Sequence, residues 1–281
     1  MLRKLLKLPL VMLMLVSAGM SPAVTHSEDL QTHVQPTPPP VLAYTLLRQI
    51  PREKNHFTEG MVFVGGNLFE STGHYGNSSL YRFKSPDFSL VKKTDLPQDV
   101  FGEGLTAIDN RLYQLSWKGG DLFIYDLELQ QQDRLPIPGD GWGLTTDGKD
   151  LIMSDGSDTL YFRDALTAHE LRRVTVMDAT GKTWQNLNEL EWVNGVILAN
   201  VWHLDTVLII DPTSGTVTGQ YQLEKLSQIA GKLMPGRTGE QVLNGMAWNP
   251  LTNTLLVTGK DWPLWFEIAL VPTPSIKNKG H

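Results

Sequence analysis

The side chains with the clearest chemical potential recur at one position of a short repeated motif. In the segments FTEG and FGEG the last glycine follows Glu59 or Glu103, and the corresponding positions of three further segments hold Trp142, Asn188 and Asn244. A carboxylate can bind an amine and transfer its proton. An amide can hydrogen-bond to negative charge that develops on an oxygen. These residue types indicate acid–base chemistry, or the binding of a small polar ligand.

A second recurring position follows in each segment and holds Gly73, Trp117, Gly156, Trp202 and Lys260. Taken singly, a tryptophan is more often a core residue and a lysine a surface residue. At equivalent positions of a repeat, they predict a semi-apolar pocket with converging polar groups. Burial would raise the pKa of a carboxyl group there and a nearby ammonium would lower it, so the sequence leaves the sign of the shift open.

Composition removes several other chemistries. The chain has no cysteine, which excludes disulfides, thiolate zinc sites and a cysteine nucleophile. Its seven histidines show no paired metal-ligand spacing, and there is no GxSxG motif or nucleotide-binding glycine loop. A calcium site built from Glu59, Glu103 and Asp155 is conceivable, but tryptophan and lysine suit a cation poorly. We therefore expect neither a metal nor a cofactor.

The elements that must position these residues form an internal repeat. Aligning Gly60, Gly104, Gly143, Glu189 and Gly245 gives steps of 44, 39, 46 and 56 residues, and a mean of about 46 is the size of a four-stranded propeller blade. Short apolar runs separated by turn signals fill each unit. The sequence thus predicts an all-β, five-bladed β-propeller. A strand over Val41–Ile50 should close the last blade beside Phe266–Leu270, which removes an exposed edge.

The two ends of the chain are expected to lie outside this domain. Residues 1–23 have the basic start, apolar run and small-residue cleavage sites of a signal peptide. A Pro-rich linker over 24–40, the propeller over 41–271 and a flexible tail over 272–281 should follow. We expect export to the periplasm or the medium, with membrane attachment only if the signal peptide stays uncleaved.

The charge of the chain bears on its partners. Cleavage would remove three basic residues and no acidic ones, which changes the net charge from −6 to −9. No long basic run is present, so we expect no nucleic-acid partner. We also expect a monomer.

The motifs together carry a family resemblance. The segments FTEG, LFESTGHYGNSSL, FGEGLT, LYQLSWK, GWGLTTDG, LNELEW, ANVW, LNGMAWNP and VTGKDWP resemble the glutaminyl-peptide cyclotransferases of the plant and bacterial type, in the same order, from about Tyr44 to Leu270. The resemblance implies a five-bladed propeller, unrelated to the zinc-dependent animal enzymes. It also implies conversion of the N-terminal glutamine of peptides and proteins to pyroglutamate with release of ammonia.

The resemblance assigns roles residue by residue. Glu103 would bind the substrate α-amine and pass its proton to the leaving ammonia, Asn188 would lie near the γ-carboxamide, and Lys260 would lie near the substrate carbonyl oxygens. Pocket walls would come from Trp117, Trp142 and Trp202, and the mouth from Phe57, Glu59 and Phe101. Some relatives carry Gln at the Glu59 position. Trp192 and Trp248 should pack within blades, whereas Asn244, Gly73 and Gly156 have no evident task.

Two rival functions stay open at this point. A non-catalytic propeller that binds peptide N-termini would present a similar ring, because an amine-binding carboxylate serves binding as well as catalysis. A calcium-dependent propeller hydrolase is the other, since one fold hosts many activities.

Overall fold

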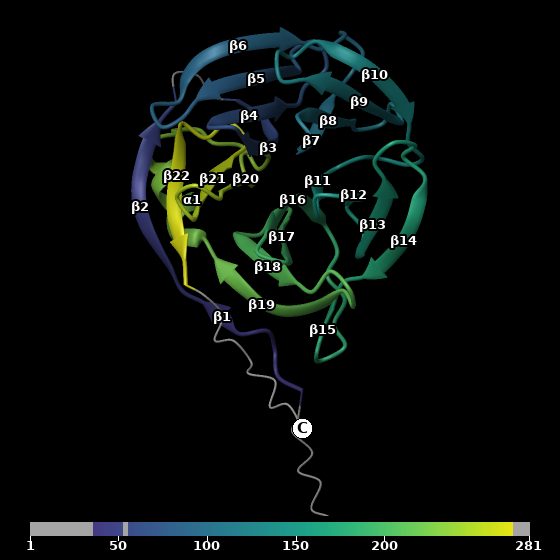
Figure 1. Cartoon of the computed structure of the whole chain (residues 1–281). Coiled ribbons are helices and arrows are strands. Elements are labelled where there is room, and N and C mark those ends of the chain that lie inside the picture. Colours follow the sequence, from purple (N-terminus) through teal and green to yellow (C-terminus); the bar gives the residue numbers. More distant parts are fainter. Residues whose placement is uncertain (1–35, 53–55, 272–281) are drawn as a thin grey trace, which may run out of the picture. The chain divides into compact units, whose positions relative to one another are not determined.

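Five β-sheets surround a central axis in the computed structural model, which describes residues 36–52 and 56–271 (Figure 1). The expected all-β class and five-bladed propeller are confirmed. The signal peptide, the linker up to residue 35 and the tail over 272–281 lie outside the described residues. Within the described part, no helix is long and apolar enough to cross a membrane.

The first three blades have four strands each, and the chain runs from the innermost strand outward. Blade 1 consists of β3 (Thr58–Val64), β4 (Asn67–Thr72), β5 (Ser79–Lys84) and β6 (Ser89–Asp95). Blade 2 consists of β7 (Gly102–Ile108), β8 (Arg111–Ser116), β9 (Asp121–Asp126) and β10 (Gln131–Pro136). Blade 3 consists of β11 (Leu144–Thr146), β12 (Asp150–Met153), β13 (Thr159–Asp164) and β14 (Glu170–Thr175).

The last two blades recruit strands from elsewhere in the chain. Blade 4 consists of β16 (Leu187–Val193), β17 (Val196–Val201), β18 (Thr206–Ile210) and β19 (Thr216–Gln222), with β1 (Val41–Leu42) and β15 (Met177–Asp178) both parallel to β19. Blade 5 consists of β20 (Leu243–Asn249), β21 (Thr254–Gly259), β22 (Leu264–Leu270) and β2 (Tyr44–Pro51).

Ring closure occurs largely as expected. Strand β2 pairs antiparallel with β22, from Tyr44 opposite Leu270 to Pro51 opposite Leu264. The expected single strand over Val41–Ile50 is wrong at its start, because Val41 and Leu42 instead pair with the outer edge of blade 4. Both edges gain a neighbour by this division, which shields backbone groups that would otherwise be open to pairing with another chain.

The apolar core is divided among the blade interfaces. Five clusters of buried side chains lie one between each pair of neighbouring blades, including one between blades 5 and 1 around Met61, Ala247 and Trp265. Trp192 and Trp248 pack against two of these clusters, as the sequence suggested. The interior therefore fixes each blade to the next and leaves the axis to polar side chains.

Irregular pairing at the inner strands aims side chains at this axis. The register of β3 with β4 shifts between Thr58 and Gly60, and that of β7 with β8 shifts between Gly102 and Leu105. Blades 4 and 5 shift at the same place, next to Asn188 and Asn244. Because a β-bulge turns a side chain away from the regular alternation, the residue before the aligned position points inward in each case.

Close approach between blades explains the glycine that follows. A Cβ on Gly60 would lie 2.4 Å from the backbone nitrogen of Leu105, and one on Gly104 would lie 2.4 Å from that of Leu144. Only glycine fits such contacts between one inner strand and the next.

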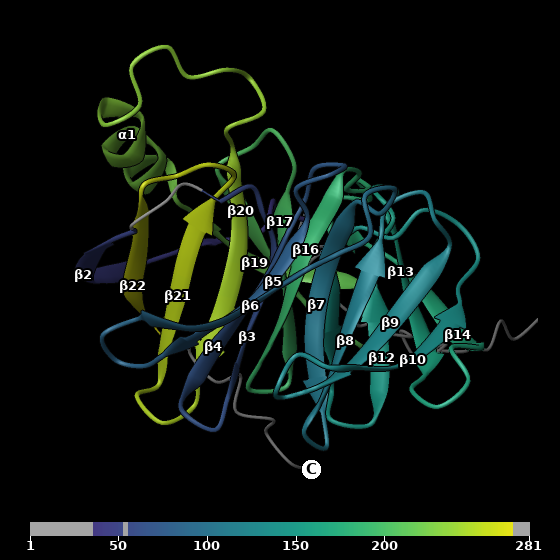
Figure 2. The same cartoon turned by 90° about the horizontal axis from the view of Figure 1, so that it is seen from above.

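A single described helix, α1 (Glu224–Lys232), follows β19 in the longest interval between repeats. Figure 2 shows that α1 and the segment after it extend beyond one end of the strands. This segment reaches the site described next.

Candidate active site

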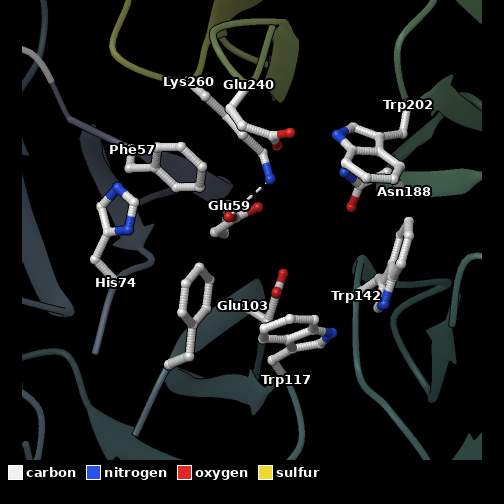
Figure 3. A pocket seen from close by; sticks show the side chains of 11 residues that line it. Phe57, Glu59, His74, Glu103, Trp117, Trp142, Asn188, Trp202, Glu240 and Lys260 are labelled. Carbon is white, nitrogen blue, oxygen red and sulfur yellow. Dashed lines mark hydrogen bonds and ion pairs between the residues drawn. The ribbon is translucent and has the colours of Figure 1, made fainter. Parts of the chain in front are cut away.

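A pocket of about 380 Å³ opens at the axis of the propeller. Figure 3 shows its side chains converging from several blades. All nine residues that the family resemblance assigned to the site line it, and His74 and Glu240 line it as well. The full lining is Phe57, Glu59, His74, Phe101, Glu103, Trp117, Trp142, Asn188, Trp202, Glu240 and Lys260. Four of the polar lining residues are deeply buried, since Glu59 is fully buried and Glu103, Asn188 and Lys260 are each less than a tenth exposed.

An ion pair forms the floor. Lys260 Nζ donates to Glu59 Oε1 at 2.8 Å, and Asn244 Nδ2 donates to Glu59 Oε2 at 3.0 Å. Burial lowers the pKa of Lys260, but the negative charges of Glu59 and Glu103 outweigh that effect and raise it. Lys260 therefore stays an ammonium. The role of Asn244, which the sequence did not reveal, is to donate a hydrogen bond to the Glu59 carboxylate. Glu59 is fully buried on the floor of the pocket, whereas the family resemblance implied a place at the mouth.

Glu103 is the carboxyl group with the unusual proton affinity. Burial, then the charge of Glu59, raise its pKa well above the usual value for glutamate, while Lys260 opposes the shift. Glu59 already accepts hydrogen bonds from Lys260 and Asn244, which favours its charged form. Burial raises the pKa of Glu59 too, but of the two neighbouring carboxyl groups Glu103 is the one with the higher proton affinity. The sign of the shift, open from sequence, is upward.

Two further polar groups are free to meet a ligand. Neither Asn188 Oδ1 nor Trp202 Nε1 has a hydrogen-bond partner among the described residues, although both atoms are buried. Buried polar atoms are nearly always satisfied in a working protein. A carboxamide or carbonyl bound in the pocket would supply partners for an acceptor on Asn188 and a donor on Trp202.

Hydroxyl groups from the preceding blade hold two of these residues. Ser71 Oγ on β4 donates to the backbone carbonyl of Glu103 at 2.5 Å. Ser154 Oγ, which follows β12, donates to the backbone carbonyl of Asn188 at 2.6 Å. Each hydroxyl fixes the bulged backbone from which a pocket side chain projects, so neighbouring blades position one another's polar groups.

Aromatic rings form the walls, and two glycines make room for them. Trp142 and Trp202 meet edge to face with 5.4 Å between ring centroids, and Phe101 contacts Trp117 at 5.5 Å. A Cβ on Gly73 would lie 2.3 Å from the Phe101 ring. A Cβ on Gly156 would lie 2.7 Å from the Trp142 ring. Both glycines at the second recurring position therefore leave room for an aromatic lining residue, a role that the sequence did not reveal.

Sequence reasoning missed two lining residues. His74 follows β4 and packs against Phe57 with 4.1 Å between ring centroids. Glu240 lies between α1 and β20, in the interval where the repeat is longest. Neither residue occupies a repeated position, so the alignment of the repeats could not identify it as a lining residue. The motif LFESTGHYGNSSL did contain His74, and the unusual length of the interval was the one available signal for Glu240.

Two more carboxyl groups lie along the inner strand of blade 4. Glu189 and Glu191 are buried, and burial raises the pKa of Glu191 to about 8. The backbone N–H of Trp248 donates to Glu191 Oε1 at 2.6 Å. Glu191 does not line the pocket, so this carboxyl group is a structural feature of the interface between blades 4 and 5.

Fold and pocket together define a β-propeller with one aromatic-walled acid–base site on its axis. Within that class, the chain belongs to the glutamine cyclotransferase family, whose sequence profile matches residues 13–270.

Individual relatives agree with this assignment. A glutaminyl-peptide cyclotransferase of Arabidopsis thaliana is 38% identical over 231 residues, which cover 80% of this chain and 70% of the plant protein. The crystal structure of the glutaminyl cyclase of Myxococcus xanthus superposes with a TM-score of 0.77 at 35% identity, covering 84% of this chain and 100% of that one. The match to a solved relative thus extends over that protein's whole length.

Proposed function

We propose that this protein is a glutaminyl-peptide cyclotransferase, which converts the N-terminal glutamine of peptides and proteins to pyroglutamate and releases ammonia. The observation that carries the proposal is the convergence of Glu103, Asn188 and Lys260 in one aromatic-walled pocket of a chain from this family. These groups match what the reaction requires, which is one proton transfer and stabilisation of one oxyanion.

The reaction closes a five-membered ring within one molecule. The α-amine nitrogen forms a bond to the γ-carbonyl carbon, and the bond from that carbon to the amide nitrogen breaks. Because the step is already unimolecular, the pocket's main tasks are to fold the glutamine side chain back on itself and to move the proton. The walls formed by Trp117, Trp142 and Trp202 exclude water around the folded side chain.

Glu103 carries the proton between the two nitrogens. It accepts a proton from the attacking amine and gives it to the departing amide nitrogen, so no net proton is consumed by the protein. Its raised pKa makes it a stronger base than an exposed glutamate and brings its proton affinity closer to that of the amine.

The oxyanion that forms at the γ-carbonyl needs fixed donors. The Lys260 ammonium supplies one, and Trp202 Nε1 adds a buried donor that has no partner among the described residues, while Asn188 Oδ1 can accept a hydrogen bond from the N–H of the γ-carboxamide. Since Lys260 also binds Glu59, its position is set before the substrate arrives, which lowers the reorganisation needed in the transition state.

The test is ammonia release from a glutamine-initiated dipeptide, measured for the wild type and Glu103→Gln. We expect turnover by the wild type and a loss of about 10²-fold or more in kcat for the variant. A peptide that binds without releasing ammonia would indicate the non-catalytic propeller instead. A near-normal kcat in Glu103→Gln would remove that residue from the mechanism.

We further propose that the protein works outside the cytoplasm as a monomer, with peptide or protein substrates as its partners. The signal-peptide pattern over residues 1–23 supports the location outside the cytoplasm. N-terminal sequencing of the exported protein should find a start near residue 24, and light scattering should give the mass of one chain. Retention of residues 1–23 in a membrane fraction would show instead an uncleaved anchor.

A further inference from the structure

The pocket has a gradient of burial from floor to mouth. Glu59 is fully buried, the ring residues Trp117 and Trp202 are half-buried, and Glu240 is exposed. Under the proposed function, the α-amine and γ-carboxamide of a substrate must reach Glu103 and Asn188 on the inner side. The peptide then leaves through the open side, so its second residue lies at the mouth, where Glu240 is.

Glu240 has an uncommitted carboxylate. Its side chain makes no hydrogen bond or ion pair with the described residues, while it lines the pocket beside Lys260 (Figure 3). The charge of Lys260 compensates for it only in part, because that ammonium, although Glu240 also attracts it, is bound to Glu59 at 2.8 Å. The mouth therefore presents a free negative charge next to the path of the substrate.

Other charges near the mouth do not cancel this one. Asp140 is also exposed, and its charge helps to raise the pKa of Glu103, so a second carboxylate acts on the site. Trp117 lies on the far side of the pocket from Glu240 in Figure 3. Lys118 Nζ is 4.3 Å from the centroid of that tryptophan ring, and Lys118 is not among the lining residues. The electrostatic character of the entrance beside Lys260 is acidic.

We infer that Glu240 selects substrates by the charge of the residue that follows the N-terminal glutamine, favouring lysine or arginine and disfavouring aspartate or glutamate at that position. The inference rests on the proposed function and names its preferred substrate class: glutamine-initiated peptides with a basic second residue. At a partly exposed site, opposite charges attract modestly and like charges repel. The difference between a basic and an acidic second residue therefore contains both the attraction and the repulsion.

The test compares three amidated dipeptides, Gln-Lys, Gln-Ala and Gln-Glu, which differ in the second side chain and carry no terminal carboxylate. For the wild type we expect kcat/KM to be about fivefold higher for Gln-Lys than for Gln-Glu, which corresponds to about 1 kcal/mol. In Glu240→Gln this ratio should shrink to about twofold or less. Raising the salt concentration should compress the wild-type ratio in the same way, because exposed charges are screened.

Glu224→Gln provides the matched control. Glu224 lies in the first turn of α1, in the same interval of the chain, and within the described part of the protein its carboxylate accepts a hydrogen bond only from Gln228 Nε2, at 2.9 Å. This change removes the same net charge without touching the pocket, so it should leave the ratio as in the wild type. An equal ratio in wild type and Glu240→Gln, or a preference for Gln-Glu, would overturn the inference. Failure of all three dipeptides to release ammonia would overturn the proposed function, and this inference with it.

Discussion

Lys260 Nζ lies 2.8 Å from Glu59 Oε1, and this buried ion pair joins the last blade of the propeller to the first. The pair forms the floor of the pocket. Asn244, also in blade 5, donates a hydrogen bond to the same carboxylate and so fixes its orientation. Charge neutrality at the floor leaves Glu103 as the group that changes its protonation state.

Removing one member of the floor pair should be worse than removing both. Glu59→Gln leaves the buried Lys260 ammonium without its partner, which should lower the free energy of unfolding by about 3–5 kcal/mol. Combining it with Lys260→Met removes the orphaned charge and should restore part of that loss without restoring activity. Denaturant titrations of the two single variants and the double variant measure the coupling, and a double variant no more stable than Glu59→Gln would argue against this account.

The raised pKa of Glu103 predicts where activity is lost in acid. As a base, Glu103 must be unprotonated when the amine attacks, so kcat/KM should fall as pH falls through its folded pKa. That pKa is above the usual value of 4.5, so the acid limb should lie at correspondingly higher pH. The limb should disappear in Glu103→Gln, while the titration of the substrate amine, at about 8, should persist in both enzymes. An acid limb unchanged in the variant would assign it to another group.

Metal chelation should leave the reaction unaffected. The carboxylate best placed to hold a cation, Glu59, already binds the Lys260 ammonium and the Asn244 amide group. A divalent cation would have to displace that ammonium and then tolerate its charge nearby. Activity measured before and after EDTA treatment should agree within error. Inhibition that added calcium or zinc reverses would favour the metal-dependent alternative.

A methyl group at Gly73 should damage substrate binding more than folding. Its Cβ would lie 2.3 Å from Cε1 of Phe101 and 3.0 Å from Glu59 Oε1, so the Phe101 ring must move from its place in the pocket lining. We expect Gly73→Ala to raise KM about 10-fold or more, since a misplaced wall can cost up to about 10²-fold in rate, with a smaller change in melting temperature. Gly231→Ala in α1 serves as the control, because its Cβ would meet only the flexible end of Arg237. Unchanged KM in Gly73→Ala would show that the ring has room to move elsewhere.

Glu191 should make stability depend on pH. Burial raises its folded pKa to about 8, from a usual value of 4.5. Between these values the folded protein keeps a proton that the unfolded chain has lost, so stability should fall as pH rises from about 4.5 to about 8 and then level off. Each pKa unit corresponds to about 1.4 kcal/mol, which bounds the effect near 5 kcal/mol. Glu191→Gln should therefore gain stability relative to wild type between pH 5 and pH 9, as measured by thermal unfolding; a constant difference would contradict the assignment.

The repeat made the fold and the ring of pocket residues predictable. Once the five segments were aligned, symmetry alone required that Glu103, Asn188 and Lys260 face one axis, although 157 residues separate the first from the last. The split between β1 and β2 was not predictable, because both parts of Val41–Ile50 have strand character and each could pair with the edge of a sheet. Pairing with blade 4 or blade 5 is decided by the path of the chain in space.

Structural features that do not follow from the repeat could not be predicted from the sequence, for a different reason. Glu240 lies in an interval that has no counterpart in the other blades, so nothing placed it relative to the axis. The Glu59–Lys260 pair depends on distances between side chains that symmetry leaves free. The supporting roles of Gly73 and Gly156 depend on the rotamers of Phe101 and Trp142, which only the packed structure determines.

Because β2 and β22 close the ring, blade 5 meets blade 1 only after the last strands have been synthesised, and the active site cannot form before then. The floor needs Glu59 from blade 1 and Lys260 from blade 5, which are 201 residues apart. A growing chain therefore has no complete floor until nearly all of it has been made, and contacts so distant in sequence form slowly. We expect a chain that stops before β21 to have no cyclisation activity, even where its earlier blades have folded. The topology of the propeller therefore makes activity a property of the nearly complete chain, and a prematurely terminated product should be inactive.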